Sequence, residues 1–406
     1  MKKIELLAPA GDLNKLKTAI DYGADAVYLA GTNYGLRTAS KNLTNDDLRE
    51  AVKYCHDRGK KIYVTMNIIA HNRHFKGAED YIRFLDDIGV DAIIASDVGM
   101  ISLLKKVVKN AEIHLSTQAS VTNFETCKFW KEQGVDRIIL ARELSLEEIK
   151  EIKSQVDIDL ETFVHGAMCI SYSGRCLLSN YMCGRDANLG DCAHACRWKY
   201  HLVEEKRPGE YYEIEDTEDG AFILNSKDLC MIDNIDKLIE CGIDSLKIEG
   251  RVKSEYYVAT VVRSYRMAID AYYEGRYDEN ISLKLLSEIR KASHRDFTHG
   301  FFLEKPDSNA QIYDRSSYIR LYDFLAKVLS YDEETSIATL EQRNKISLGD
   351  KVEVFGPNID FFEMTIDNLS DENGDNINEA PHAQQIIKIK MPKEVKTGYM
   401  LRKKID

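Results

Sequence analysis

The sequence predicts an α/β protein: a (β/α)8 TIM-like barrel with a cysteine-rich insertion after its seventh strand, followed by a small C-terminal β-barrel domain. Two observations predict the barrel. A short phrase of glycine, one small or apolar residue and aspartate recurs four times before an apolar run, and eight strand-like segments alternate with helical ones over about 260 residues. Short alternating runs punctuated by turn residues, beginning near residue 318, predict the second domain.

The recurring phrase marks the joint between a helix and the next strand. Its copies are Gly23-Ala24-Asp25, Gly89-Val90-Asp91, Gly134-Val135-Asp136 and Gly242-Ile243-Asp244. Each copy follows an amphipathic helical stretch, so its glycine fits the left-handed position that ends a helix. The apolar run that follows fits a buried parallel strand.

The remaining elements complete eight βα units. The predicted strands are Ile4–Ala8, Ala26–Ala30, Lys61–Met66, Ala92–Ala95, Glu112–Ser116, Arg137–Ala141, Leu160–Val164 and Ser245–Ile248. The predicted helices between them are Leu13–Tyr22, Asn45–Arg58, Ala78–Ile88, Gly99–Lys109, Asn123–Gln133 and Ser145–Gln155. An open doubly wound sheet is the alternative, but no GxGxxG follows the first strand, which weakens a dinucleotide-binding version of it.

Three domains or segments are expected. The barrel domain spans 1–275 with its cysteine-rich insertion at about 167–230, a helical connector spans 276–317, and the small β-barrel domain spans 318–406. Strands of the last are predicted at Leu325–Leu329, Ser336–Glu341, Lys351–Phe355, Glu363–Ile366 and Gln385–Ile389.

Composition indicates a folded and acidic protein. With 44% hydrophobic residues, the chain of 406 residues is too apolar to be disordered, and its apolar runs fall far short of the roughly 20 residues that cross a bilayer. No signal peptide is evident, so we expect a cytoplasmic protein without membrane contact. A net charge of −12 argues against RNA binding through overall charge. One basic stretch, either an RNA contact or a solubilising tail, comprises Lys388, Lys390, Lys393, Lys396, Arg402, Lys403 and Lys404.

Polar residues follow the predicted strands, at the face where barrel enzymes hold their active sites. The candidates are Arg37, Asn67, Gln118, Arg142, His165, Glu249 and Arg251. Guanidinium groups bind carboxylates through paired hydrogen bonds, so the three arginines predict a pocket for an anionic small molecule. In the alternative interpretation, Arg142 pairs with Glu143 or Glu249 and is structural.

Five of the nine cysteines fall within 28 residues of the insertion: Cys169, Cys176, Cys183, Cys192 and Cys196. In a reducing compartment such a cluster indicates metal binding. The spacing contains no CxxC knuckle, which favours an irregular iron–sulfur site. A zinc site and a set of free buried cysteines are the two alternatives. The preferred ligands are Cys169, Cys176, Cys192 and Cys196, with Cys230 in reserve and Cys183 less favoured.

The segment from Glu161 to Ser179, ETFVHGAMCISYSGRCLLS, resembles the signature of the collagenase-like U32 peptidase family. The resemblance extends to Leu7–Gly11, Ser116–Gln118, Cys192–Trp198 and Ser245–Arg251. Within the family the chain is similar to the tRNA hydroxylation protein branch. That similarity implies hydroxylation of a tRNA wobble uridine to 5-hydroxyuridine with prephenate and an iron–sulfur cluster of the 4Fe–4S type. The implied partners are the tRNA anticodon loop and prephenate, with a paralogous subunit as a further candidate.

The roles expected for the site residues follow from these two lines of reasoning. Arg142 and Arg251, together with Arg37, are expected to hold the carboxylates of a prephenate-like compound in a pocket that Asn67 and Gln118 also line. His165 and Glu249 are expected to orient groups or shuttle protons.

Two other functions remain as alternatives. A collagenase-like peptidase needs an activated nucleophile or a metal-bound water, and the sequence holds neither HExxH nor GxSxG. A pair formed by His165 and Cys169 would compete with the cluster for one sulfur. A zinc-containing RNA-binding scaffold without catalysis is the third possibility.

Overall fold

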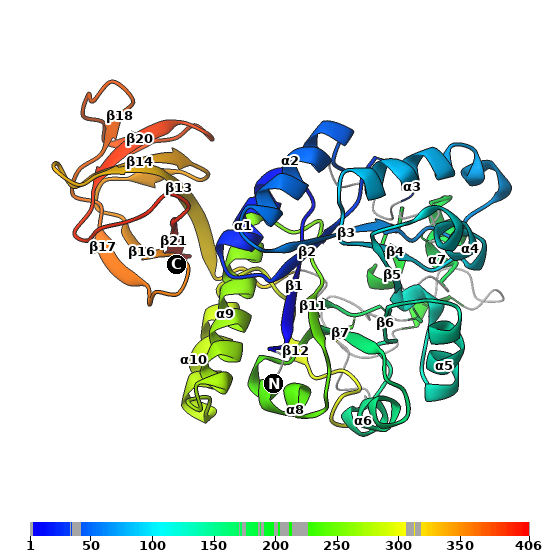
Figure 1. The fold of residues 1–406 in the computed structure, drawn as a ribbon. Helices are drawn as coiled ribbons and strands as arrows, with labels where there is room; N and C mark the ends of the chain where they lie inside the picture. The colour runs from blue at the N-terminus through cyan, green and yellow to red at the C-terminus, as the bar shows by residue number, and fades with distance from the viewer. Residues whose placement is uncertain are drawn as a thin grey trace.

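The computed structural model describes residues 3–32, 34, 42–169, 171–172, 176–185, 187, 191–198, 202–203, 211–212, 226–305, 312 and 318–405. Within these residues, eight parallel strands close into a barrel, which confirms the predicted fold class (Figure 1). They are β1 (Glu5–Pro9), β2 (Ala26–Leu29), β3 (Lys61–Met66), β4 (Ala92–Ala95), β5 (Glu112–Leu115), β6 (Arg137–Ile139), β7 (Asp159–Ala167) and β11 (Ser245–Ile248). The barrel closes because β11 pairs with β7 on one side and with β1 on the other, which places Ser245 opposite both Glu161 and Glu5.

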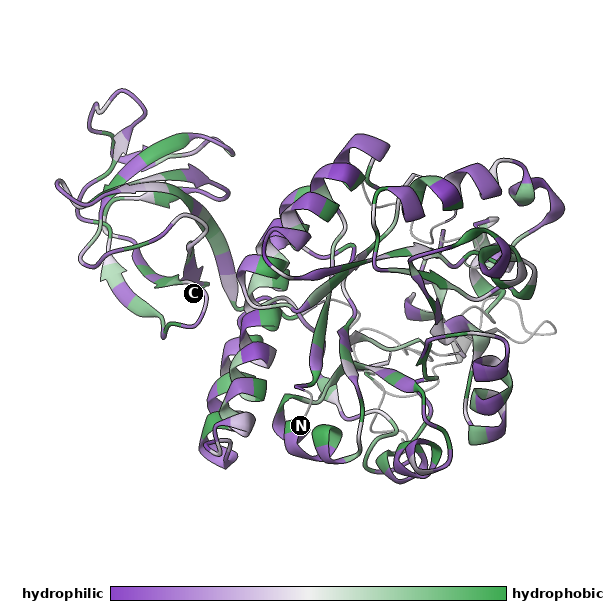
Figure 2. Cartoon of the chain, viewed as in Figure 1, coloured by the Kyte–Doolittle hydropathy of each residue, from purple (hydrophilic) through white to green (hydrophobic). Residues whose placement is uncertain are grey.

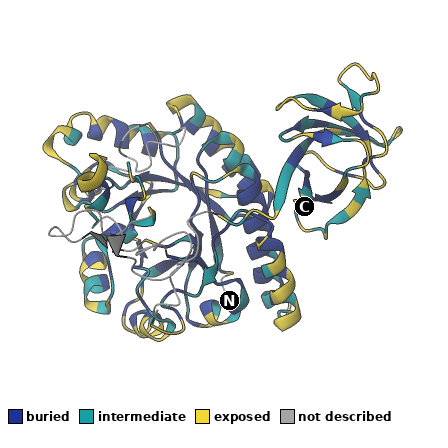
Figure 3. Ribbon diagram, turned by 180° about the vertical axis from the view of Figure 1, so that it is seen from behind, coloured by how far each residue is buried: buried dark blue, intermediate teal, exposed yellow. Residues whose placement is uncertain are grey.

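Helices surround the strands, so the strands are buried while the outer helical faces meet solvent (Figure 3). They are α1 (Leu13–Asp21), α2 (Asn45–His56), α3 (Ala78–Asp87), α4 (Val98–Val107), α5 (Phe124–Glu132), α6 (Leu146–Gln155), α8 (Ile235–Glu240), α9 (Glu255–Tyr273) and α10 (Glu279–Ile289). Short 3₁₀ turns are η1 (Asn72–Phe75), η2 (Thr117–Ala119) and η5 (Ile232–Asn234). Figure 2 shows hydrophilic and hydrophobic residues together on each outer helix, as expected of amphipathic helices. No helix in the described part of the chain is long and apolar enough to cross a membrane.

The structure explains both invariant positions of the recurring phrase. Its glycine ends a helix with a positive φ in every copy, at 108°, 85°, 77° and 80° for Gly23, Gly89, Gly134 and Gly242. Its aspartate accepts a hydrogen bond from a backbone N–H of the preceding strand, at 3.1, 2.8, 2.8 and 2.9 Å for Asp25, Asp91, Asp136 and Asp244. Each copy therefore ends a helix and ties the joint to the neighbouring strand.

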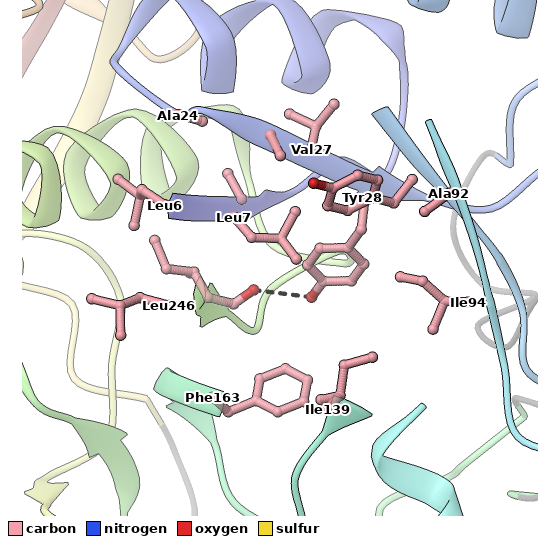
Figure 4. Packing of buried hydrophobic residues seen from close by; sticks show 14 of the residues in the cluster. Leu6, Leu7, Ala24, Val27, Tyr28, Ala92, Ile94, Ile139, Phe163 and Leu246 are labelled. Atoms are coloured by element: carbon pink, nitrogen blue, oxygen red, sulfur yellow. Dashed lines mark hydrogen bonds between the residues drawn. The ribbon is translucent and has the colours of Figure 1, made fainter. Parts of the chain in front are cut away.

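The barrel interior is only partly apolar, which corrects the expectation of apolar strand interiors. Residues such as Leu7, Tyr28 and Phe163 pack together, and the Tyr28 hydroxyl donates to the Ile248 carbonyl at 2.9 Å (Figure 4). Among them lie buried ion pairs: Arg137 with Glu5 at 2.5 Å, and Lys247 with Glu161 at 2.6 Å.

These buried charges are held by one another. Burial would raise the pKa of Glu5, but Arg137 outweighs it and leaves the pKa below its ordinary value. Burial lowers the pKa of Lys247, although Glu161 opposes the shift. Breaking one partner of such a pair is costly because the other charge stays buried.

The insertion after β7 is bound to the barrel by a strand. β7 extends to Ala167, beyond its predicted end at Val164, and its last residues pair antiparallel with β10 (Asp228–Cys230). β10 in turn pairs with β12 (Phe297–Thr298) from the predicted connector. The described part of the insertion also contains α7 (Leu178–Cys183), η4 (Ala195–Arg197) and the strand pair β8 (Leu202–Val203) and β9 (Tyr211–Tyr212).

The C-terminal domain is a curled antiparallel sheet with its own hydrophobic core, which includes Leu340, Val354 and Ile387. In the described residues its strands follow the order β17-β16-β21-β13-β14-β20-β18. Their bounds are β13 (Tyr322–Asp332), β14 (Ile337–Gln342), β16 (Lys351–Phe355), β17 (Phe362–Thr365), β18 (Ser370–Asp371), β20 (Ile386–Lys390) and β21 (Met400–Lys404), with β15 (Ile346–Ser347) and β19 (Glu379–Ala380) as a separate pair.

The last strand corrects the prediction of a basic C-terminal tail. β21 lies between β16 and β13, and its Arg402 is fully buried. Arg402 contacts Glu353 at 2.6 Å and Glu288 of α10 at 2.8 Å, while Lys403 pairs with Asp350 at 2.6 Å. Because α10 packs on α9 of the barrel, the Arg402–Glu288 pair fixes the C-terminal domain against the barrel domain.

Candidate active site at the carboxyl ends of the barrel strands

Two predicted amides meet inside the mouth of the barrel. Asn67, directly after β3, donates from Nδ2 to Oε1 of Gln118 in η2 at 2.7 Å. Ser116, which ends the β5 segment, donates to the same oxygen at 2.8 Å and was not among the predicted residues. Parallel strands end at one edge of the sheet, which is why residues 51 positions apart come into contact. The amide pair gives this mouth a fixed polar wall.

Arg142 and Glu249 also meet at the mouth, from the ends of β6 and β11. Nη2 of Arg142 lies 3.6 Å from Oε2 of Glu249, Nη1 donates to the Ala167 carbonyl at 2.9 Å, and the guanidinium stacks 4.0 Å from the ring centroid of Phe163. Arg142 therefore pairs with Glu249, as the structural interpretation of this arginine anticipated. Its Nε is buried without an acceptor among the described residues.

Arg251 is buried beneath the same mouth. It donates from Nη1 to the Thr65 hydroxyl of β3 at 2.9 Å. Gly11 makes this approach possible, because a Cβ at Gly11 would lie 2.0 Å from the Arg251 carbonyl oxygen. Arg37, the third arginine expected at the site, lies outside the described residues.

The structure revises the role expected for His165. Its ring is enclosed by Tyr257 and Tyr265 of α9 and Phe297 of β12, with centroids at 6.0, 5.6 and 5.7 Å. Burial lowers its pKa to about 3, and Lys253 adds to the shift. The imidazole is therefore neutral near pH 7 and packs among aromatic rings, which does not suit a proton shuttle.

Four cysteines of the insertion, in the segments after β7, are coupled electrostatically. Burial raises the pKa of Cys196, Arg197 opposes that shift, and the thiols of Cys169, Cys192 and Cys176 raise the pKa further. Cys169, Cys192 and Cys176 therefore each lie within electrostatic range of Cys196. Among the described residues, no three His, Cys, Asp or Glu side chains converge closely enough to hold a single metal ion.

Side-chain contacts hold the insertion in place. Arg197 of η4 donates to the Met168 carbonyl at 3.0 Å, one residue before Cys169. Ser179 of α7 accepts from the backbone N–H of Ala193 at 2.9 Å, which links α7 to the segment between Cys192 and Cys196. These contacts bring cysteine-bearing segments that are distant in sequence to one end of the barrel.

The two other cysteines considered as ligands have different surroundings. Cys183 ends α7 and donates from its thiol to the Ser179 carbonyl at 3.0 Å. Cys230, in β10, is buried, and its pKa is raised to about 12 by that burial. Its side chain contacts Tyr265 rather than the group around Cys196.

A cavity of about 570 Å³ was not predicted. It is lined by Ser120, Thr122, Ser171 and Tyr172, so it joins the segment after β5 to the segment after Cys169. The hydroxyl of Ser120 is buried without a partner among the described residues. A volume of this size accommodates a small organic ligand or a nucleotide.

Comparison with known proteins is unambiguous at the family level. Residues 11–312 match the model described as Peptidase family U32, and residues 320–402 match the Peptidase family U32 C-terminal domain. The chain is 47% identical over 402 residues to tRNA hydroxylation protein P1 of Bacillus subtilis, covering 99% of this chain and 95% of that protein. It is 36% identical over 443 residues to tRNA hydroxylation protein P of Escherichia coli, covering 99% and 96%.

A relative with a proteolytic name is also found. The chain is 32% identical over 367 residues to a protein named Collagenase from Porphyromonas gingivalis, covering 87% of this chain and 86% of that protein. With both domains matched along nearly the whole chain, the protein belongs to peptidase family U32, alongside relatives named tRNA hydroxylation proteins.

Proposed function

We propose that this protein hydroxylates tRNA, converting the wobble uridine to 5-hydroxyuridine, with prephenate as co-substrate and a 4Fe–4S cluster held by Cys169, Cys176, Cys192 and Cys196. The names of its full-length relatives support RNA hydroxylation. The observation that carries the proposal is the position of the cysteine-rich segment, which begins at the end of β7 against an arginine of the mouth. Arg142 binds the carbonyl of Ala167, and Cys169 follows two residues later, at most about 7 Å along the chain.

The cysteine group suits an iron–sulfur cluster by its chemistry. Thiolates are the ligands of such clusters, and each thiolate binds a different iron atom, so the ligands spread more widely than around one zinc ion. The support for this cofactor is the number of cysteines in the insertion and the electrostatic coupling of Cys196 to Cys169, Cys176 and Cys192. When bound, the cluster supplies redox chemistry that amino-acid side chains lack.

The residues of the mouth bind and orient the acid. Arg142 and Arg251 supply the guanidinium groups for the carboxylates of prephenate. The Asn67–Gln118 pair fixes an amide wall beside them. Glu249 holds Arg142 in place until the ligand arrives, and His165 supports the aromatic packing behind β7.

Proteolysis has less support from this geometry. A cysteine nucleophile needs a base near its working pKa, whereas His165 has a pKa of about 3 and lies among Tyr257, Tyr265 and Phe297.

Anaerobic purification tests the cofactor. We expect about four irons per chain with thiolate-to-iron charge-transfer absorbance, and we expect Cys196→Ala to lose them. Cys183→Ala is the matched control because Cys183 lies in the same segment and is expected to keep the iron. Iron loss in Cys230→Ala but not in Cys196→Ala would move the fourth ligand to Cys230. Zinc without iron in the wild-type protein would refute the cluster.

Nucleoside analysis tests the reaction. A host that lacks its own tRNA hydroxylation proteins is given this gene, and its tRNA is digested and measured by mass spectrometry. We expect 5-hydroxyuridine to appear, and to disappear when the host is also blocked in prephenate synthesis. Unmodified uridine in cells that contain folded, iron-loaded protein would refute the reaction. Modification that persists without prephenate would refute the co-substrate alone.

A further inference from the structure

The cysteine-rich insertion exposes an unusual set of large apolar side chains. Within its described residues, Tyr181 is 87% exposed and Trp198 is 42% exposed, and Tyr172 is also exposed. These aromatic residues alternate with the cysteines along the chain: Tyr172 follows Cys169, Tyr181 precedes Cys183, and Trp198 follows Cys196. Exposed apolar side chains gathered in one segment mark an interaction surface rather than a packing surface.

Contacts within the insertion place two of these rings on adjacent segments and the third at the cavity. Tyr181 lies on α7, which packs on η4, and Trp198 directly follows η4. Tyr172 lines the cavity of about 570 Å³ together with Ser120 and Thr122 of the barrel. Tyr172, Tyr181 and Trp198 therefore lie exposed on the segments that carry the cysteines, and we call these three residues the aromatic surface.

Charge decides which kind of nucleic-acid contact this surface can make. The chain carries a net charge of −12, and two of its C-terminal basic residues, Arg402 and Lys403, are already paired with acids. Attraction to phosphates is therefore weak overall. Stacking of unpaired bases on aromatic rings does not depend on net charge, and the hydroxyl groups of Ser120, Thr122 and Ser171 offer hydrogen bonds to a base edge or a ribose.

We propose that the aromatic surface is a stacking surface that holds unpaired bases of an RNA loop and directs one of them to the cavity lined by Tyr172. The inference rests on the proposed RNA hydroxylation and assigns the recognition of the loop to named residues. The occupant is single-stranded RNA. Its flat bases can stack on the aromatic rings, and their polar edges can form hydrogen bonds with the hydroxyl groups that line the cavity.

Tryptophan fluorescence provides a direct test. The chain has two tryptophans: Trp130 is buried on α5 and Trp198 is exposed. A base stacked on Trp198 therefore quenches the fluorescence of Trp198 and leaves the fluorescence of Trp130 unchanged. Iron-loaded protein is titrated with an unmodified anticodon stem-loop RNA. We expect quenching in the wild-type protein and none in Trp198→Phe, which keeps an aromatic ring and therefore retains most of the affinity.

Binding measured by fluorescence anisotropy of labelled RNA adds the magnitude. Trp198→Ala and Tyr181→Ala are each expected to weaken binding by about 5-fold to 100-fold, the usual effect of removing one stacking ring. Phe129→Ala is the matched control, since Phe129 is 52% exposed but lies on α5 of the barrel, and it is expected to bind as the wild type does. Iron content verifies that each variant retains its fold.

The outcomes separate the inference from the function on which it rests. If wild-type protein hydroxylates tRNA and the Trp198→Ala and Tyr181→Ala variants bind the loop as tightly as the wild type, the stacking surface is refuted while the function stands. If wild-type protein neither binds the loop nor modifies tRNA, both are refuted. Quenching of Trp198 by a collagen-like peptide and not by RNA would assign this surface to a protein partner and would also refute the proposal.

Discussion

Gly166 controls how closely the end of β7 approaches Glu249, and replacing it with alanine tests the geometry of the mouth. Its φ is +105°, and a Cβ there would lie 2.7 Å from the Glu249 carbonyl oxygen and 2.9 Å from the Glu249 Cβ. The substitution therefore adds backbone strain and a collision with a backbone atom that cannot rotate away. Gly59 is the matched control, because its φ is +65° and a Cβ there meets nothing within 4 Å.

The two substitutions should differ by the cost of the collision. Alanine at a positive φ costs about 1 kcal/mol, as expected for Gly59→Ala, whereas Gly166→Ala adds about 2 kcal/mol of overpacking. Since the entropy of unfolding is about 0.6 kcal/mol/K for a barrel of about 300 residues, the expected fall in Tm is about 5 °C for Gly166→Ala and about 2 °C for Gly59→Ala.

Activity provides the second measurement of this prediction. Moving Glu249 disturbs its 3.6 Å contact with Arg142, so tRNA hydroxylation should fall at least about tenfold in Gly166→Ala and remain normal in Gly59→Ala. Equal Tm values and equal activities in the two variants would show that the end of β7 has room that the structure does not show.

Two further predictions concern buried charge. Arg402→Met leaves Glu288 and Glu353 buried with one fewer cation, and we expect a loss of about 3 kcal/mol in the free energy of unfolding, measured by urea denaturation; a change below about 1 kcal/mol would contradict the ion-pair network. Burial lowers the pKa of His165 from its ordinary value of 6.5 to about 3 in the folded protein. Between these two pH values the unfolded chain binds one proton more than the folded protein, so the free energy of unfolding falls as the pH drops from 6.5 to about 3. His165→Phe should remove this part of the pH dependence and keep hydroxylation activity; loss of activity in a folded variant would restore a catalytic role to His165.

The barrel could be predicted from the sequence because its joints are local. A glycine that must adopt a positive φ and an aspartate that caps the neighbouring strand both lie within three residues of the strand that they precede. The buried charges could not be assigned in the same way. Glu161 and Lys247 lie 86 positions apart, and only closure of the sheet brings them within 2.6 Å.

The site shows the same division between local and distant information. Asn67 and Gln118 could be predicted as site residues because the carboxyl ends of all strands share one face of a barrel. This rule does not require the register between neighbouring strands. His165 was assigned to the mouth by the same rule, but a register shift between β7 and β11 intervenes: Lys247 lies opposite Phe163 and Ile248 opposite His165. One extra residue in β7 breaks the alternation of side chains, so the rule no longer tells which way His165 faces.

The distribution of ion pairs inside the barrel explains why binding capacity is left at the mouth. At the base, Arg137 lies 2.5 Å from Glu5 and Lys247 lies 2.6 Å from Glu161, so these cations are already neutralised at contact distance. At the mouth, Arg142 lies 3.6 Å from Glu249, beyond hydrogen-bond length. A carboxylate ligand that approaches Arg142 more closely gains the interaction that Glu249 leaves incomplete, and it does so without disturbing the charges on which the stability of the barrel depends.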